Sequence, residues 1–158
     1  YLAKKCKANP SSPKGDLIDV KSTHPIKGSY AVNNIFDFAS HRSSFKTEAN
    51  SAMSFTIDFR DSRVQVDAYT IKCFPQSQGS LQPTNWKISG STNGENWDLI
   101  DEQRNIILEQ CPDTTKTFVL LKKTNKYKFV KFDHPPIKND KFGLCVSAFE
   151  LFGVFYEK

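Results

Sequence analysis

The chain lacks the residue patterns of the common catalytic and metal-binding sites. Its four cysteines show no CxxC spacing and no neighbouring histidine, so a zinc site is not expected. Its three histidines, His24, His41 and His134, are too far apart in the sequence to follow a metal-ligand spacing. No P-loop, G-x-S-x-G or HExxH motif is present. We therefore predict that the protein is not an enzyme and has no cofactor.

Arginine is scarce among the basic residues. The net charge of +5 comes from eighteen lysines and only four arginines, whereas arginine is the side chain whose planar fork suits phosphates and bases. Seven of the lysines lie between Lys122 and Lys141. Such a cluster either discourages aggregation at a solvated strand edge or binds an anionic partner. Anion or nucleic-acid binding through residues 122–141 is therefore only a weaker alternative.

Features of secreted and membrane proteins are also few. The chain has no Asn-x-Ser/Thr sequon, no signal peptide, and no apolar run as long as a membrane span. Cys73 and Cys145 lie in strand-like segments, where we expect small buried hydrophobic residues, although the even number of cysteines leaves disulfides open. These features favour an intracellular location over secretion. Because the chain begins at Tyr1, we also expect it to be part of a longer protein.

Apolar and polar residues alternate with a period of two through most of the chain. Met53, Phe55, Ile57 and Phe59 alternate with polar residues, as in a half-buried strand. Similar segments occur at residues 16–21, 64–74, 86–90, 97–100, 117–123, 126–132 and 146–155. Residues 31–38 suggest one helical turn. About eight strands in a chain with 13% aromatic residues predict one all-β domain, an antiparallel sandwich or jelly-roll barrel.

Both tryptophans of the chain fall within one short stretch, NWKISGSTNGENWDLI. The pair Asn93-Gly94 between two strand-like runs predicts a hairpin with a type I′ turn, because both residues accept a positive φ. Trp86 and Trp97 would each bring a large apolar surface to the pair of strands. We predict that both rings are buried in the core.

The segments SFTIDF, VDAYTIKCF, NWKISGSTNGENWDLID, YKFVKF and AFELFGVF, taken in order, resemble the discoidin family, also called factor V/VIII type C domains. The resemblance covers about residues 16–156. It implies an eight-stranded jelly roll of the galactose-binding-like class over residues 16–158, with residues 1–15 as a tail or a junction with a preceding domain.

Secreted members of that family join a cysteine near the start to one just after the final Phe-Gly. Cys6 matches the first position, but Val154 stands at the second. The resemblance therefore implies the intracellular branch, in which the domain commonly follows a BTB-type assembly domain. It leaves oligomerisation open, with such a preceding domain as the candidate for it.

Loops gathered at one end of the barrel bind the ligand in that family, and loops carry function on such scaffolds generally. The matching loops here are residues 23–32, 37–45 and 75–85. Their polar side chains are the candidate ligand contacts: His24, Lys27, Tyr30, His41, Arg42, Gln76, Gln78 and Gln82. We single out His41 and Arg42, because arginine offers a planar set of donors and histidine donates or accepts.

These loop tips carry few bulky apolar residues, so membrane insertion is not expected. The resemblance implies a non-catalytic recognition module that binds a protein partner or a glycan. The alternative is an extracellular-type lectin or adhesion domain that binds galactose-like sugars or a cell-surface lipid. A disulfide at Cys6 would favour that alternative.

Sugar-binding relatives often hold a structural calcium ion in a Phe-Asp-Gly turn. This chain has Phe36-Asp37-Phe38 there, and Asp37 is the residue that would contribute a carboxylate. Phe38 stands where a glycine would let the backbone fold around the ion. Bound calcium is therefore the less favoured expectation.

Overall fold

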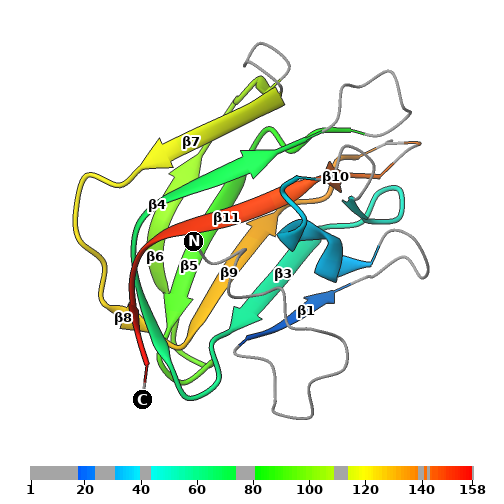
Figure 1. The fold of residues 1–158 in the computed structure, drawn as a ribbon. Helices are drawn as coiled ribbons and strands as arrows, with labels where there is room; N and C mark the ends of the chain where they lie inside the picture. The colour runs from blue at the N-terminus through cyan, green and yellow to red at the C-terminus, as the bar shows by residue number, and fades with distance from the viewer. Residues whose placement is uncertain are drawn as a thin grey trace.

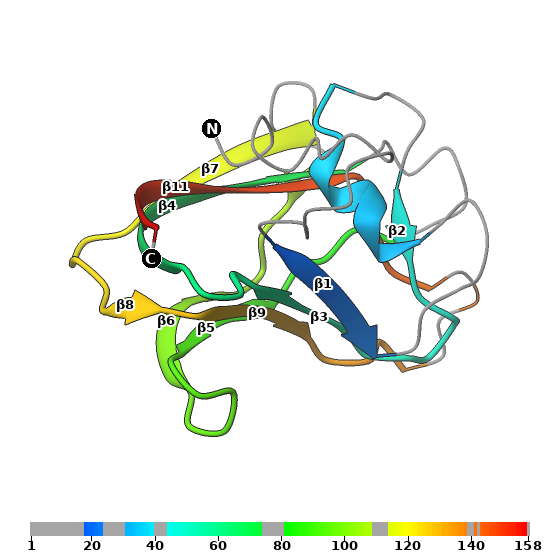
Figure 2. The same cartoon turned by 60° about the horizontal axis from the view of Figure 1, so that its bottom comes forward.

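The computed structural model describes residues 18–23, 31–39, 44–73, 81–108, 114–138, 141 and 143–157. Two antiparallel sheets lie face to face, as Figures 1 and 2 show. The elements are β1 (Asp19–Thr23), η1 (Val32–Phe36), β2 (Phe45–Lys46), β3 (Met53–Asp58), β4 (Arg63–Lys72), β5 (Trp86–Ser91), β6 (Asp98–Gln103), β7 (Thr115–Val119), β8 (Lys126–Tyr127), β9 (Phe129–His134), β10 (Cys145–Val146) and β11 (Ala148–Tyr156).

The strand order is β1-β3-β9-β5-β6 in the larger sheet and β11-β4-β7 in the smaller one, where β8 also pairs with β4. Strands β10 and β2 form a separate short pair. Among the described strands, eight have five or more residues. The antiparallel jelly-roll sandwich expected from the sequence is thus confirmed, and η1 lies within the segment expected to form a helical turn.

Strand β7 ends earlier than the sequence predicted. The expected strand ran to Lys123, but β7 stops at Val119, and the side chain of Leu121 is fully exposed. The backbone N–H of Leu120 donates to the carbonyl of Asp67 (2.9 Å), beside an irregularity in the pairing of β4 with β11. This contact ends the regular pairing, so the apolar pair Leu120-Leu121 belongs to a loop.

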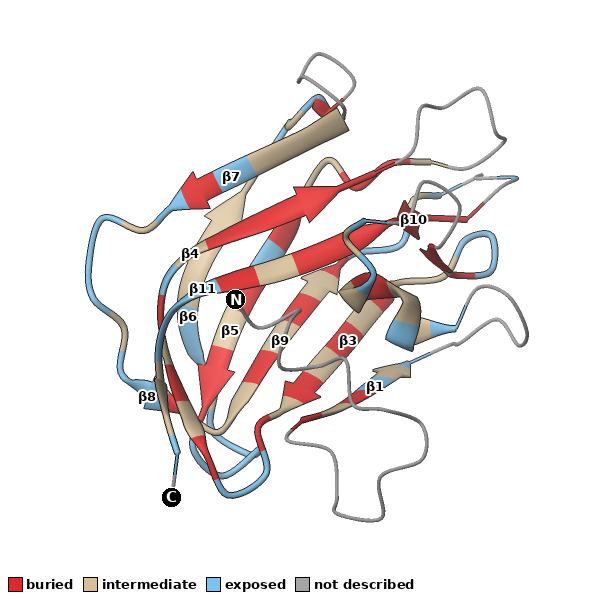
Figure 3. Ribbon diagram, viewed as in Figure 1, coloured by how far each residue is buried: buried red, intermediate tan, exposed pale blue. Residues whose placement is uncertain are grey.

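Buried residues are concentrated on the strands of the two sheets (Figure 3). Aromatic rings join the sheets across the core. The ring of Phe55 on β3 stacks on Phe132 of β9, with centroids 5.0 Å apart, and meets Phe149 of β11 edge-on at 5.3 Å. Such offset and edge-on pairs stabilise a core beyond the apolar area they bury. Cys73 and Cys145 are both buried, as expected.

The two tryptophans have different environments, and the prediction that both are buried is wrong for Trp97. Trp86 is 1% exposed, and its indole N–H donates to the Tyr69 hydroxyl at 2.9 Å. Trp97 is only half-buried, and the ammonium nitrogen of Lys131 lies 4.5 Å from the centre of its ring. Since Lys131 is on the outer face of the larger sheet, Trp97 lies there too.

The connection between β5 and β6 explains the position of Trp97. Only Gly94 of the Asn-Gly pair has a positive φ (83°), so the two-residue type I′ turn does not form. The side-chain oxygen of Asn93 instead accepts hydrogen bonds from the backbone N–H groups of Glu95 and Asn96, each at 3.0 Å. This longer loop delays the return strand until Asp98 and leaves Trp97 outside the core.

Candidate functional site

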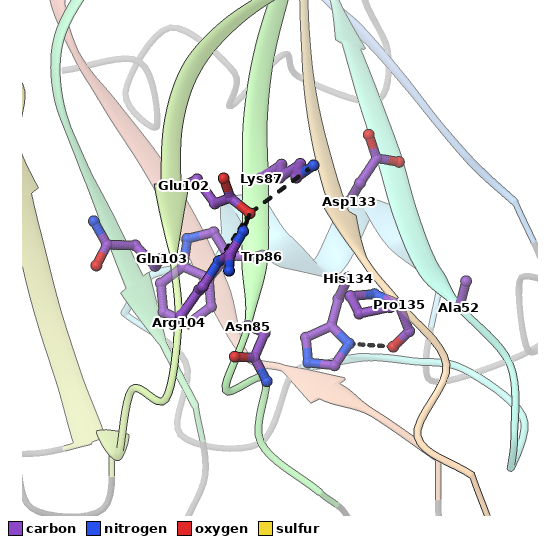
Figure 4. Close-up of a pocket in the computed structure, with 10 residues that line it drawn as sticks. All are labelled: Ala52, Asn85, Trp86, Lys87, Glu102, Gln103, Arg104, Asp133, His134 and Pro135. Atoms are coloured by element: carbon purple, nitrogen blue, oxygen red, sulfur yellow. Dashed lines mark hydrogen bonds and ion pairs between the residues drawn. The ribbon is translucent and has the colours of Figure 1, made fainter.

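An open pocket of about 590 Å³ lies at the end of the larger sheet where β3 and β5 begin and β6 and β9 end (Figure 4). Small-molecule sites commonly have volumes of roughly 300–1,000 Å³. The lining residues come from three strands, β5, β6 and β9, and from the loops that adjoin these strands and β3: Ala52, Asn85, Trp86, Lys87, Glu102, Gln103, Arg104, Asp133, His134 and Pro135.

Charged side chains on the rim are arranged in pairs. Glu102 accepts hydrogen bonds from Nη2 (2.9 Å) and Nε (3.1 Å) of Arg104, and its carboxylate lies 3.9 Å from the Lys87 ammonium (Figure 4). Asp133 accepts a hydrogen bond from the Ser54 hydroxyl at 2.7 Å. The rim therefore offers fixed donors and fixed acceptors with balanced charge.

Hydrogen bonds from backbone N–H groups fix the segment at the start of β5. The side-chain oxygen of Asn85 accepts from the N–H of Asn105 at 2.9 Å, and the carbonyl of Thr84 accepts from the N–H of Ile106 at 2.9 Å. The N–H of Thr84 donates to Nε2 of His134 at 3.3 Å. The rim of the pocket is thus held in place without a ligand.

His134 is a structural residue of this rim. Its ring is buried, Nε2 accepts from Thr84, and Nδ1 donates to the carbonyl of Pro135. Burial lowers the pKa of His134 below its usual value of 6.5, because the charged form loses its hydration. The neutral ring therefore positions the segment that precedes β5.

This burial predicts that acid weakens the fold. The unfolded chain binds a proton to His134 more readily than the folded chain, so the free energy of unfolding should fall as the pH drops below 6.5. Denaturant unfolding at pH 7.5 and 5.5 measures the change. The variant His134→Gln should show a smaller difference between the two pH values; an unchanged difference would contradict the assignment.

Trp86 borders the pocket, and a chain of hydrogen bonds holds its buried ring in place. The Tyr69 hydroxyl accepts from the indole N–H and donates to the carboxylate of Asp101 at 2.6 Å. Burial, and then the hydrogen bond to Asp101, raises the pKa of Tyr69, so the hydroxyl stays a donor. The indole ring therefore has a fixed orientation in the core beside the pocket.

No protein-family model and no curated protein matches the sequence. Solved structures do share its fold. The module CpGH89CBM32-5 from Clostridium perfringens, solved with GalNAc-β-1,3-galactose, matches with a TM-score of 0.69 at 15% identity, over 86% of this chain and 95% of that one. The family 32 carbohydrate-binding module of NanJ from C. perfringens, solved with galactose, matches with a TM-score of 0.63 at 13% identity, over 87% and 93% of the two chains.

The chain has the galactose-binding-like fold. This confirms the fold class expected from the resemblance to discoidin domains. The same fold occurs within a GH29 fucosidase from Ruminococcus gnavus, solved with fucose, with a TM-score of 0.68 at 16% identity; the match covers 89% of this chain and 26% of the fucosidase. Identities this low establish the fold and nothing more.

Most of the predicted ligand contacts fall outside the described residues of this galactose-binding-like domain: His24, Lys27, Tyr30, His41, Arg42, Gln76 and Gln78. They stay predictions, as do the tail at 1–15 and the BTB-type branch. Gln82 is described and is 6% exposed, so it lies below the surface of its loop. Asn85, the last residue of the predicted loop 75–85, lines the pocket, so the pocket adjoins that loop.

The turn after η1 does not fit a calcium ion. Asp37 follows η1 directly, and its backbone N–H donates to the carbonyl of Asn34 at 3.1 Å. The carbonyl of Phe38 accepts a hydrogen bond from the Lys72 ammonium at 3.2 Å. A positive charge at this carbonyl opposes the oxygen coordination that calcium needs. Among the described residues, no cluster of three or more His, Cys, Asp or Glu side chains is arranged for a metal.

Three of the seven lysines in residues 122–141 lie against a carboxylate or an aromatic ring. Lys128 lies 4.0 Å from the carboxylate of Asp58, and the Lys126 ammonium lies 3.8 Å from the centre of the Tyr156 ring. Lys131 pairs with Asp133 at 3.1 Å, on the outer face of the larger sheet. Lys126 thus lies beside the smaller sheet, and Lys128 and Lys131 lie beside the larger one.

None of the helices in the described part of the chain is long and apolar enough to span a membrane.

None of the pocket-lining residues was among the predicted ligand contacts; the four charged ones are Lys87, Glu102, Arg104 and Asp133. The signal available was the alternation of polar residues along the strands that flank the Asn-Gly pair, which places Lys87 and Glu102 on solvent-facing positions. Their pairing depends on the β5–β6 register, in which Lys87 lies opposite Glu102. The sequence does not display that register, because a bulge shifts it between Ile88 and Ser89.

Proposed function

We propose that this domain is a non-catalytic glycan-binding module and that the pocket at the end of the larger sheet is part of its binding site. The observation that carries the proposal is the open pocket itself, with prearranged polar groups on its rim. Pockets of this kind orient a small ligand through a few placed polar groups.

The rim chemistry matches a neutral sugar. Sugar hydroxyls donate and accept hydrogen bonds; Arg104 and Lys87 supply donors, and Glu102 and Asp133 supply acceptors. Two cations and two carboxylates give no net charge, which favours a neutral glycan over an anionic one.

The solved neighbours support a sugar ligand, since the two Clostridium modules hold galactose and GalNAc-β-1,3-galactose. Catalysis is not part of the proposal, because the pocket carboxylates of Glu102 and Asp133 each pair with a cation, Arg104 and Lys131. The predicted intracellular location is a separate proposal. Mapping the thiols tests it, and a disulfide at Cys6 would count against it.

Binding of the purified chain to a glycan panel tests the function, and Arg104→Ala tests the site. We expect Arg104→Ala to weaken binding about tenfold, because a charged hydrogen-bond donor is lost from the rim. Arg60→Ala is the matched control: Arg60 is also exposed (52% against 73% for Arg104) and also pairs with one carboxylate, that of Asp19. Arg60→Ala should bind like the unchanged chain.

The double variant His41→Ala/Arg42→Ala compares the pocket with the predicted loops. Loss of binding in this variant alone, with Arg104→Ala unaffected, would move the site to residues 37–45. No binding of any glycan by the folded chain would overturn the proposed function. A protein partner would then become the leading interpretation.

A further inference from the structure

The pocket continues onto the outer face of the larger sheet. Lys87 and Asp133 both line the pocket, and they lie opposite each other on β5 and β9. Lys131 lies two residues before Asp133 on β9, about 7 Å from it on the same face. The Lys131 ammonium lies 3.1 Å from the Asp133 carboxylate, so the polar rim and the sheet face are connected.

An aromatic ring lies at the far end of this connection. The Lys131 ammonium that contacts Asp133 is also 4.5 Å from the centre of the Trp97 ring. The Phe129 ring is tilted by 55° to that of Trp97, with centroids 6.5 Å apart. Leu99, opposite Ser89 in the β5–β6 register, is 58% exposed. A half-buried indole outside the core, beside paired charges, is a surface suited to a ligand that is part apolar and part hydroxylated.

We propose that Trp97, Lys131 and Asp133 form a second sugar position beside the pocket, so that the domain binds a neutral oligosaccharide across both. This rests on the proposed function of the pocket. Trp97 supplies an apolar ring for the second sugar, Lys131 donates to its hydroxyls, and Asp133 accepts from them. The contacts run along β9 from the pocket to Trp97, so the bound oligosaccharide should lie along that strand.

Neighbouring carboxylates again select the ligand class. Each cation along this surface has a carboxylate within 4.0 Å: that of Asp133 for Lys131, and that of Glu102 for both Lys87 and Arg104. A polyanionic chain would meet a carboxylate beside each of these cations, which opposes its binding. The second position therefore favours an uncharged sugar, as the pocket does.

NMR titration tests the proposal, because the chain has only two indole N–H groups. The probes are galactose against GalNAc-β-1,3-galactose, and N-acetylglucosamine against its β-1,4-linked dimer. We expect a disaccharide to bind about fivefold tighter than its single sugar and to shift the Trp97 indole resonance, which the single sugar leaves in place. The buried Trp86 indole, bonded to Tyr69, reports that the fold is intact.

The variants Trp97→Ala and Lys131→Ala should lose the advantage of the disaccharide and keep the affinity for the single sugar. Phe152→Ala is the matched control, because Phe152 is an exposed aromatic residue (37%) on β11 of the opposite sheet. Should Trp97→Ala fail to fold, Lys131→Ala gives the same comparison with the ring in place.

The outcomes separate the two proposals. Binding of the single sugars with no gain from the second unit, and no response of Trp97, would overturn the second position and leave the pocket standing. If neither the single sugars nor the disaccharides bind at the pocket residues, both the second position and the pocket on which it rests are overturned.

Discussion

Replacing Trp86 by alanine should lower the free energy of unfolding by about 3–5 kcal/mol. Trp86 is among the largest fully buried side chains of the described core. Its ring meets Phe118 edge-on at 5.4 Å and lies 6.1 Å from Phe132. The truncation leaves a cavity between the sheets and removes the partner of the Tyr69 hydroxyl. Urea unfolding measures the loss.

The matched control is the other tryptophan. Trp97→Ala removes the same side chain from the outer face of the sheet, where less apolar surface is buried, so we expect a loss of about 1 kcal/mol. Trp86→Phe keeps an aromatic ring and should lie between the two alanine variants. Equal losses in Trp86→Ala and Trp97→Ala would contradict the different environments described for the two rings.

Gly153→Ala should cost about 3 kcal/mol of stability, although Gly153 lies in an exposed part of β11. Gly153 has a φ of 150° at the irregularity in the β4–β11 pairing. A Cβ atom there would lie 1.9 Å from the backbone carbonyl oxygen of Gln65. Because backbone atoms of the neighbouring strand cannot rotate away, β11 would have to separate from β4.

Gly94→Ala is the control for backbone strain without a clash. Gly94 also has a positive φ (83°), but an added Cβ would first meet a Phe129 ring atom at 3.4 Å. We expect this variant to cost about 1 kcal/mol. Thermal unfolding of both variants separates backbone strain from the clash of the added Cβ atom. A Gly153→Ala variant as stable as Gly94→Ala would show that the irregularity at Gly153 rearranges to accommodate the Cβ atom.

The strands could be predicted from the sequence because burial is periodic there. Phe55 and Ile57 are buried on β3 while Thr56 between them is not, which is the pattern the residues alone display. Trp97 could not be placed in the same way. The loop before it forms through the side-chain oxygen of Asn93, and a local signal for a tight turn does not reveal that competing interaction.

The pocket was harder to predict than the fold. Its paired charges lie on different strands: Lys87 on β5 faces Glu102 on β6 and Asp133 on β9. Forty-six positions separate Lys87 from Asp133 in the chain (133 − 87), so only the strand order brings them together. Resemblance to a family supplied the loop residues, such as His41 and Arg42, but offered no signal for residues on the strands.

The strand order also determines when this chain becomes able to fold during its synthesis. The contact between Ser54 on β3 and Asp133 on β9 joins residues 79 positions apart. Strand β4 likewise pairs with β11, the last strand in the sequence. Pairings this distant make folding slow compared with helical domains of similar size. A nascent chain on the ribosome therefore holds β3 and β4 without these partners until β9 and β11 emerge, and a chaperone that covers those apolar strands would act in that interval.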